Sequence, residues 1–571
     1  MKSMKKTIKK IRGGWLRELA GELRFIYGYA VQHRFEVLLY MLIGVLSTAM
    51  SLGAALLSKH IIDAVTGKDT NAIIPAAFFY LTMHILSIAF NAFSSRINAR
   101  IQLKVDQDIR ADVYDSITSS SWLSLGAYRS GDLLSRLESD VSVVSKSVLG
   151  WLCDIVTKLI RFIGALAIIL YYDPPLALIS LLAVPFSVLL SQLLLRKLRT
   201  FSVEMRKAAA ELTSFSEESF AKISEIKSLG LSEAYRQKLR QQQDNYKQKY
   251  LKYVSFSVSL TAFMSVIGTA IAGACFLWCA WRLWEGVITF GTMTLFLQMS
   301  GTLSGSFSAI LSTIPSAVTS AACAGRIKAI MSLEKENTED SQKAQELIDK
   351  GNITVEARGV SFSYDSSATV FENTGFIAKP GDIVGIVGAS GEGKTTFLRM
   401  LLGLVSITDG SLCVSSSDSQ KINISAGTRK LFSYVGQENI MFNATVRENM
   451  LIVCPDASDE QTIDALKSAC AYDFVASKPE GLDTVIGDSS KSFSQGQLQR
   501  LSIARAILCN RPIMLLDEAT SALDEKTERM LIESLADCAS SRTIIVATHR
   551  PGILKLCNKV YRIENSRLTL Q

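Results

Sequence analysis

One stretch of the chain has residues of the right types and spacing to hold a chain of phosphates. Residues 388–395 read Gly-Ala-Ser-Gly-Glu-Gly-Lys-Thr. Glycines let backbone N–H groups turn toward phosphate oxygens, because no Cβ blocks backbone conformations with positive φ. Lys394 would reach the terminal phosphates of a nucleotide, and the Thr395 hydroxyl would coordinate Mg²⁺. We therefore predict nucleotide-binding residues in and directly after this stretch, namely Gly388, Ser390, Gly391, Gly393, Lys394, Thr395 and Thr396.

The neighbouring sequence supplies the elements that would position this loop. A β-branched apolar run, 383–387, precedes it, and a helical pattern, 397–402, follows it. This strand–loop–helix setting distinguishes a phosphate-binding loop from an ordinary turn. The helix beneath the loop would add the positive end of its dipole.

A second apolar strand pattern, 512–516, ends in two carboxylates, Asp517 and Glu518. Parallel sheets place their ligands at the carboxyl ends of strands. We therefore expect Asp517 to hold Mg²⁺ and Glu518 to orient the attacking water or accept its proton. A third strand pattern, 543–547, leads to Thr548 and His549. A lone histidine is usually structural, but one at this sheet edge is predicted to sense the terminal phosphate.

Length and composition indicate more than one domain. The chain has 571 residues, too many for one core, and its 48% hydrophobic content and mean hydropathy of +0.24 are high for a soluble protein. Six apolar runs, each close to the about 20 residues that cross a bilayer, explain this. They lie near 37–57, 73–93, 149–170, 176–195, 254–278 and 287–310. We predict a transmembrane domain over 1–331, a surface linker over 332–352 and a soluble nucleotide-binding domain over 353–571, with both termini cytosolic.

The charge distribution supports this orientation, because Lys and Arg are concentrated in the inner connections and before the first apolar run. The net charge of +8 is modest. A nucleic-acid-binding arm is one interpretation of the basic amino terminus, but a helix on the cytosolic membrane surface explains it better, because a membrane-spanning chain follows. We therefore expect membrane lipids, and no nucleic acid, as partners. The ten cysteines are scattered without zinc-ligand spacing, and we interpret them as small apolar core residues.

The two long inner connections, about 96–147 and 196–253, would touch the nucleotide domain. No proline occurs between Pro75 and Pro174 or between Pro185 and Pro315. Proline breaks helices, so both connections are predicted to be uninterrupted helices that project into the cytosol.

With these motifs assembled, the chain resembles an ATP-binding cassette (ABC) exporter half-transporter over essentially its full length. Residues 493–500, Phe-Ser-Gln-Gly-Gln-Leu-Gln-Arg, are similar to the family signature: Ser494, Gly496 and Gln497 match, whereas Phe493 and Gln495 depart. Further resemblances are Gln437 to the Q-loop, Tyr364 to the aromatic residue that stacks on adenine, Asp524 to the D-loop, 130–141 to the first intracellular loop and, more loosely, 216–229 to the second. For Tyr364, an ordinary strand tyrosine is the alternative.

The resemblance implies a six-helix transmembrane domain with long cytosolic helical extensions, followed by an α/β P-loop NTPase domain. It implies ATP and Mg²⁺ as cofactors, with Mg²⁺ held by Thr395, Gln437 and Asp517. The implied catalytic residues are Glu518, His549, Gln437 and Lys394. The implied function is ATP-driven export of an amphipathic drug, lipid or peptide by alternating access, in the cell membrane of a bacterium. The signature of one subunit completes the site of the other, so the resemblance also implies a dimer.

Several alternatives stay open. A homodimer is the simpler interpretation, because Lys394, Gln437, Glu518 and His549 are all present, but the chain could also pair with a degenerate partner. A regulatory role for ATP binding and an uptake function are the other classes. Asp154, Lys158 and Arg161 share one face of the third predicted span. They could contact a transported molecule, form a structural ion pair, or reach lipid headgroups.

Overall fold

The computed structural model describes residues 16–571 except Trp151, 365–368, Ser390, 417–420, Asn439, 488–492 and 540–541. The chain divides into two compact units. The first comprises Met1–Tyr114 and Gly131–Ala329, and the second comprises Asp115–Ser130 and Ile330–Gln571.

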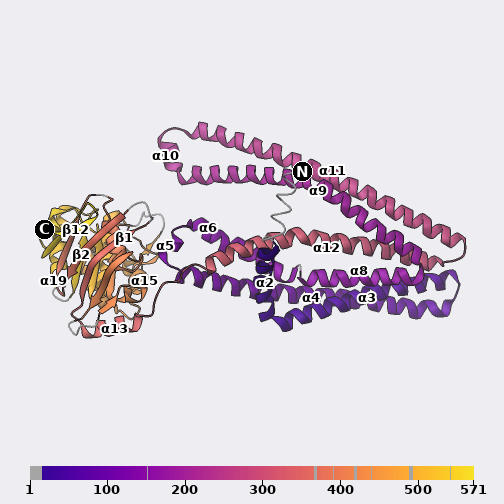
Figure 1. Cartoon of the computed structure of the whole chain (residues 1–571), viewed down its shortest axis with the longest axis horizontal. Coiled ribbons are helices and arrows are strands. Elements are labelled where there is room, and N and C mark those ends of the chain that lie inside the picture. Colours follow the sequence, from indigo (N-terminus) through magenta and orange to yellow (C-terminus); the bar gives the residue numbers. More distant parts are fainter. Residues whose placement is uncertain are drawn as a thin grey trace. The chain divides into compact units, whose positions relative to one another are not determined.

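The first unit is helical throughout its described elements (Figure 1). Its helices are α2 (Leu16–Gln32), α3 (Arg34–Thr66), α4 (Thr70–Ser119), α6 (Ser130–Ser135), η2 (Arg136–Asp140), α7 (Val141–Gly150), α8 (Leu152–Tyr172), α9 (Pro174–Ala221), α10 (Ile223–Ser228), α11 (Ser232–Trp284) and α12 (Phe290–Met331). The last residues of α4 belong to the second unit.

Five of the six predicted apolar runs have all their described residues in helices, and the third covers the end of α7 and most of α8. The sixth run begins three residues before α12. Among the described residues, three helices are long and apolar enough to cross a membrane: Arg34–Thr66, Asn71–Ser119 and Ser232–Trp284. In α4, the large apolar side chains of Ile74, Phe78 and Ile85 are exposed. Apolar side chains exposed along such a helix are what a lipid-facing surface requires.

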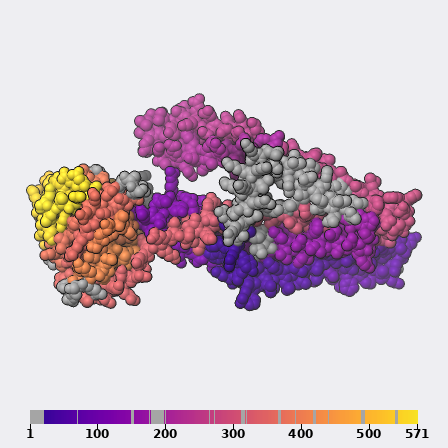
Figure 2. Space-filling model, viewed as in Figure 1, coloured from indigo at the N-terminus to yellow at the C-terminus, as the bar shows by residue number. Residues whose placement is uncertain are grey.

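The inner connections differ from the prediction of uninterrupted helices, which is wrong. The first leaves α4 at Ser119 and reverses through α5 (Trp122–Leu125) and α6, and the second reverses through α10. A chain that returns to the membrane has to turn, and Gly230, with a φ of 66°, permits the turn between α10 and α11. Figure 1 shows α9 and α11 side by side with α10 at their end, and Figure 2 shows this end as a lobe of its own.

Polar and aromatic pairs join helices of the first unit that are distant in sequence. The α9–α11 pair is joined by Glu204 with Lys249 (2.9 Å), by Phe201 with Phe256 and by stacked Phe215 and Tyr235. The amino-terminal helices contact α4 through Tyr29 with Asp112 (2.7 Å), His33 with Asp108 (2.9 Å) and Glu36 with Lys104 (2.5 Å). Most of these pairs lie outside the predicted apolar runs, and only Phe256 falls within one, 254–278.

The second unit is an α/β domain with two main sheets and one short strand pair. An antiparallel four-stranded sheet has the order β2-β1-β4-β5, and a six-stranded sheet has the order β12-β11-β3-β10-β9-β6. The strands are β1 (Thr354–Ser363), β2 (Thr369–Ala378), β3 (Ile383–Val387), β4 (Asp409–Ser415), β5 (Lys421–Asn423), β6 (Phe432–Val435), β7 (Ala444–Thr445), β8 (Val485–Ile486), β9 (Ile513–Asp517), β10 (Thr543–Ala547), β11 (Lys559–Glu564) and β12 (Arg567–Leu570).

The helices of this unit are α5, α13 (Ser341–Lys350), α14 (Lys394–Leu401), α15 (Val446–Leu451), α16 (Asp459–Ser468), α17 (Tyr472–Ala476), α18 (Gln495–Leu508), α19 (Glu525–Ala539) and α20 (Pro551–Leu554), with 3₁₀ turns η3 (Ala426–Leu431) and η4 (Gly481–Asp483). Strands β3, β9 and β10 are almost continuously buried, as their runs of Ile, Val and Leu predict for parallel strands covered on both faces.

The segment predicted as a surface linker contains α13, whose Ala344 and Leu347 are fully buried in the core of the second unit. The mostly polar composition of this segment favoured a linker, but its few apolar residues lie on one face of an amphipathic helix. Before α13, Glu336 accepts two hydrogen bonds from the guanidinium of Arg429, at 2.6 and 2.7 Å. The segment that follows α12 is therefore packed onto the nucleotide-binding unit rather than lying free on its surface.

Candidate functional site

The predicted site residues gather at one edge of the six-stranded sheet. The neighbouring strands β3, β10, β9 and β6 are parallel, so their carboxyl ends meet there. Gly388 follows β3, and Asp517 ends β9. The registers pair Ala547 of β10 with both Ile386 and Asp517. The fold thus places the four loops that follow these strands side by side, which is where parallel sheets bind ligands.

The glycines of the loop that follows β3 adopt conformations that other residues avoid. Gly391 has a φ of 88° and Gly393 a φ of 107°. A Cβ on Gly393 would approach Val370 Cγ1 to 2.8 Å. Ser390 lies outside the described residues. The loop therefore needs glycine at 393 both for its backbone conformation and for space.

The Lys394 side chain crosses this loop. Its Nζ donates hydrogen bonds to the carbonyl oxygens of Gly388, at 2.8 Å, and Ala389, at 3.1 Å. The Glu392 carboxylate accepts from the Ala389 N–H at 2.6 Å. Lys394 begins α14, so its ammonium group and the helix amino terminus both contribute positive charge to the loop. These features fit the phosphates of a nucleotide.

Tyr364, predicted to stack on adenine, lies beside the start of α14. Its hydroxyl hydrogen-bonds with the Thr396 hydroxyl at 3.2 Å, and its ring packs edge-on against Phe362. The tyrosine keeps 38% of its surface exposed. The structure thus brings Tyr364 and Thr396 together and leaves part of the tyrosine accessible to a flat ligand.

Three of the predicted catalytic residues meet at Glu518. The Gln437 Nε2 donates to Glu518 Oε2 at 3.1 Å, and His549 Nδ1 lies 3.9 Å from Glu518 Oε1. Glu518 has a φ of 49°, and its N–H donates to the Ala547 carbonyl. A non-glycine residue in the left-handed region is held there by its surroundings at an energetic cost, and such residues cluster at functional sites.

Asp517 is buried next to this group, with 1% of its surface exposed. Burial raises the pKa of the Asp517 carboxyl, although a hydrogen bond from Thr395 lowers it. The Tyr434 hydroxyl also donates to Asp517, at 3.5 Å. A buried carboxylate beside a threonine hydroxyl is a donor set that suits a hard cation, which would hold the carboxylate in its charged form. The residues present therefore fit Mg²⁺.

The predicted signature residues begin α18. Ser494 and Gln497 form a reciprocal capping box, in which each side chain bonds to the backbone N–H of the other residue, at 3.3 and 2.8 Å. A Cβ on Gly496 would approach the Ala522 carbonyl oxygen to 2.8 Å. Phe493, a departure from the family signature, is buried against Phe474. Among the described residues, no hydrogen bond or ion pair joins Ser494–Gln497 to the phosphate-binding loop.

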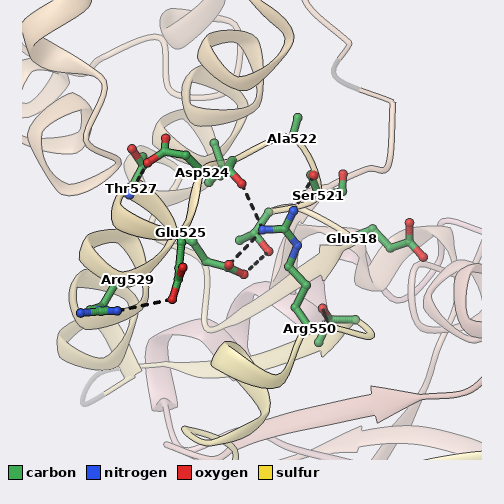
Figure 3. Close-up of polar contacts among 12 residues, drawn as sticks. Glu518, Ser521, Ala522, Asp524, Glu525, Thr527, Arg529 and Arg550 are labelled. Atoms are coloured by element: carbon green, nitrogen blue, oxygen red, sulfur yellow. Dashed lines mark hydrogen bonds and ion pairs between the residues drawn. The ribbon is translucent and has the colours of Figure 1, made fainter.

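The loop after Glu518 is held by residues that the sequence analysis did not identify. Arg550 donates to the carbonyl oxygens of Ser521 (2.6 Å) and Leu523 (3.1 Å) and to the Glu528 carboxylate (2.9 Å). Figure 3 shows the Arg550 side chain directed into this loop. Arg550 directly follows His549, so it ties the histidine loop to the loop that ends in Asp524; its position beside a predicted site residue was the available signal.

Gln499 contacts the same loop from α18. Its Oε1 accepts from the Ala522 N–H at 3.1 Å, and its Nε2 donates to the Glu518 carbonyl at 3.2 Å. Asp524 caps the start of α19 by accepting from the Thr527 N–H, at 3.1 Å. The loop from Glu518 to Asp524 is therefore fixed by the signature helix and the histidine loop together.

A contact within the second unit joins α5 to α14, the helix of the phosphate-binding loop. The Arg399 guanidinium lies 4.8 Å from the centre of the Trp122 ring, a cation–π arrangement. The Ser121 N–H donates to the Glu334 carbonyl at 2.8 Å. The tryptophan between serines and leucines in this short turn was the sequence signal for this contact.

Comparison with known proteins gives matches over both units. A family model described as "ABC transporter transmembrane region" matches residues 37–307, and one described as "ABC transporter" matches residues 371–521. A Staphylococcus aureus protein, provisionally named a multidrug export ATP-binding/permease protein, is 30% identical over 470 residues, which span 81% of this chain and 80% of that protein.

Two further similarities extend over nearly the whole chain. The Bacillus subtilis protein YfiC, an uncharacterized ABC transporter ATP-binding protein, is 27% identical over 560 residues, 97% of this chain and 91% of its own length. A solved structure of a bacterial Atm1-family ABC exporter with ATP bound superposes with a TM-score of 0.79, covering 94% of each chain at 21% identity. At this identity the structural likeness shows the fold alone.

Proposed function

Because the chain belongs to the ABC transporter family, we propose that it is an ATP-hydrolysing exporter that works as a dimer in the membrane. The observation that carries the hydrolytic part is the meeting of Gln437, Glu518 and His549 beside the phosphate-binding loop. The family supports transport, and the name of the Staphylococcus aureus relative supports export.

In the proposed mechanism, Lys394 and the loop N–H groups bind the phosphates, and Tyr364 stacks on the adenine ring. Glu518 orients the attacking water and accepts its proton, while Gln437 and His549 position the water and the terminal phosphate. Thr395, Gln437 and Asp517 would hold Mg²⁺, which when bound neutralises charge on the phosphates. These roles rest on the positions of the side chains at one sheet edge and on the resemblance of their motifs.

The proposal requires a second copy of the chain to complete each nucleotide site. Ser494 and Gly496 lie at the start of α18, where N–H groups can bind phosphates held by another subunit. The exposed apolar residues Phe220, Ile223 and Leu229 at and beside α10 support docking of that tip on the partner's nucleotide-binding unit. We favour a homodimer because Lys394, Gln437, Glu518 and His549 are all present in one chain.

In this proposal, closure of the two nucleotide-binding units is transmitted through the helical hairpins to the membrane helices, which alternate between inward and outward access. A two-state equilibrium shifts only as far as binding to the two states differs. Residues at the dimer interface of the nucleotide units would supply that difference. The chain would lie in a bacterial cell membrane with its termini and nucleotide-binding unit in the cytosol, and it would move an amphipathic molecule.

Inside-out membrane vesicles test the proposal. We expect ATP-dependent accumulation of a fluorescent amphipath in vesicles that contain the parent protein, and none in vesicles that contain Glu518→Gln. ATP hydrolysis without movement of any cargo, across a panel of lipids, peptides and drugs, would favour a regulatory role instead. ATP-driven loss of preloaded cargo from the same vesicles would identify uptake.

A further inference from the structure

Helix α8 carries a charged stripe inside a predicted membrane-spanning run. Asp154, Lys158 and Arg161 are four and three residues apart, so they lie on one face of the helix. The Lys158 ammonium donates to the Asp154 carboxylate at 2.9 Å. These two charges compensate each other, which leaves the charge of Arg161 as the net charge of the stripe.

Arg161 differs from Lys158 in that none of the described side chains pairs with it. Within the part of the chain that the structure describes, no ion pair or hydrogen bond engages its guanidinium, whereas Lys158 on the preceding turn is paired. An arginine has five N–H donors and stays charged. Such a group in a membrane-spanning segment is costly unless an anion or water satisfies it, and it therefore marks a functional position.

The stripe faces away from the surface of α8 that lipid would cover. Val156, Ile163 and Leu170 form the exposed apolar side of the helix, with exposed fractions of 36%, 55% and 54%. At about 100° per residue, Arg161 lies about 140–180° around the helix from these three residues. Arg161 is therefore on the inner side of α8.

The residues around Arg161 show what this inner side borders. Thr157 and Gly164 pack tightly on α3: a Cβ on Gly44 would meet Thr157 Cγ2 at 2.7 Å. On the other flank, the ring of Phe162 contacts that of Phe307 on α12, with centroids 6.1 Å apart. In Figure 1, α3 and α12 accompany α8 along its length. Arg161 thus points between two helices of the bundle.

Its depth separates Arg161 from both membrane surfaces. It lies about 18 Å along the helix from residue 149 and about 14 Å from residue 170, the ends of the predicted apolar run, at about 1.5 Å per residue. Both distances exceed the extension of an arginine side chain, so snorkelling to headgroups does not satisfy the charge. Water or an anion within the bundle would then satisfy the charge of the Arg161 guanidinium.

We propose that Arg161 is the anion-binding residue of the transport site and that the transported molecule is an amphipath with a carboxylate, sulfonate or phosphate group. The planar guanidinium binds such groups through two parallel hydrogen bonds. Phe162 and Phe307 offer apolar surface next to it for the body of the molecule. The Asp154–Lys158 pair provides no free carboxylate for a cation. This inference rests on the proposed transport function and specifies its substrate class.

Equilibrium binding to the full-length protein in phosphatidylcholine nanodiscs, without ATP, tests the site. The probes are anilinonaphthalene sulfonate and phenylnaphthylamine, which share one aromatic scaffold and differ by the sulfonate. We expect saturable sulfonate binding that Arg161→Gln weakens about tenfold or more, because charge-assisted hydrogen bonds are lost. Arg161→Lys keeps the charge but loses the two parallel hydrogen bonds, so its affinity should lie between those of Arg161→Gln and the parent. Phenylnaphthylamine binding should not change in either variant.

Arg206→Gln is the matched control, since it removes an exposed arginine that donates a hydrogen bond to the Ser202 hydroxyl at 3.3 Å. It should leave sulfonate binding at the parent level. The proposal is overturned if Arg161→Gln binds the sulfonate as the parent does, or if it weakens both probes equally, which would indicate a structural role. Because ATP is absent, binding without transport would leave the site standing and contradict only the transport proposal.

Two further binding experiments use the parent protein alone. An alkyl sulfonate should displace the bound probe and an alkyl trimethylammonium of equal chain length should not; equal displacement by both would overturn the proposal even if the variants fail to fold. In nanodiscs that contain phosphatidylglycerol, competition for the probe would assign the anion to a lipid headgroup. Its absence would assign the anion to a free amphipath.

Discussion

Arg550 donates a hydrogen bond to the backbone carbonyl oxygen of Ser521 at 2.6 Å, so the residue after His549 holds the loop after Glu518. The same guanidinium pairs with Glu528, which is buried on its other side. Arg550 therefore links the two loops directly.

Replacement of Arg550 by alanine should destabilise the nucleotide-binding unit by about 1.5–3 kcal/mol, the usual contribution of hydrogen bonds to charged groups. Thermal unfolding of the purified protein measures this as a lower midpoint. Arg529→Ala is the matched control: its pairing with Glu525 spans 3.6 Å between side chains that are 72% and 91% exposed. Exposed pairs contribute little, so the control should unfold with the parent. Equal effects of the two variants would contradict the assigned role of Arg550.

Glu518→Gln should lower ATP hydrolysis by about 10²–10⁴-fold, the range for loss of a general base. Nucleotide binding should persist, because the phosphate-binding loop is unchanged. The measurement is phosphate release alongside size-exclusion chromatography with ATP, in which the variant should accumulate as an ATP-bound dimer. A variant that hydrolyses ATP at the parent rate would show that another group accepts the proton.

Two glycines of the phosphate-binding loop should differ in their tolerance of alanine. Gly391 has open space around its Cβ position, so Gly391→Ala costs only the backbone strain, about 1–2 kcal/mol. Gly393→Ala adds the approach to Val370 at 2.8 Å. ATP affinity, measured by equilibrium dialysis, should therefore fall further in Gly393→Ala. Indistinguishable affinities would mean that Val370 moves aside without cost.

Tyr364→Ala should weaken ATP binding by roughly 5–150-fold, because stacking of a base on an aromatic ring contributes about 1–3 kcal/mol. Tyr364→Phe keeps the ring and loses only the 3.2 Å hydrogen bond to Thr396, so it should bind nearly as well as the parent. Inorganic triphosphate, which has no base, serves as the control ligand and should not distinguish the variants. If both substitutions weaken ATP equally, the hydroxyl rather than the ring is the important group.

Trp122→Ala should reduce the amount of cargo moved per ATP hydrolysed, since it removes the cation–π contact between α5 and Arg399, which contributes about 0.5–2 kcal/mol. Trp122→Phe keeps an aromatic face and should recover much of the coupling. Paired assays of transport and phosphate release in the same proteoliposomes give the ratio. An unchanged ratio in Trp122→Ala would place the coupling contact elsewhere.

The sequence predicted those parts of the site whose residues form contiguous motifs. The glycine loop, the carboxylates at the end of β9 and the histidine after β10 each lie at the end of a strongly apolar strand. Parallel pairing of these strands was enough to bring them to one edge. The order of strands and helices in the nucleotide-binding unit and the apolar helices could also be predicted from the sequence, because periodicity and length are local properties.

The contacts that the sequence did not predict join segments that are distant in sequence and meet only in the folded chain. Nothing in the pattern around Gln499 indicates that its amide bridges Glu518 and Ala522. The reversal of each inner connection was missed because absence of proline permits a helix but does not require one. The burial of Leu347 in a charged stretch likewise depends on the surface against which its helix packs.

The anchoring of α13 has a practical consequence for biochemistry on the soluble half. A fragment that starts at the first strand, near Ile353, would lack Ala344 and Leu347. It would expose the apolar core residues that these two side chains cover. It would also lose the carboxylate that neutralises Arg429. A stable stand-alone ATPase should therefore begin upstream of Glu334, and a shorter recombinant piece should precipitate on concentration.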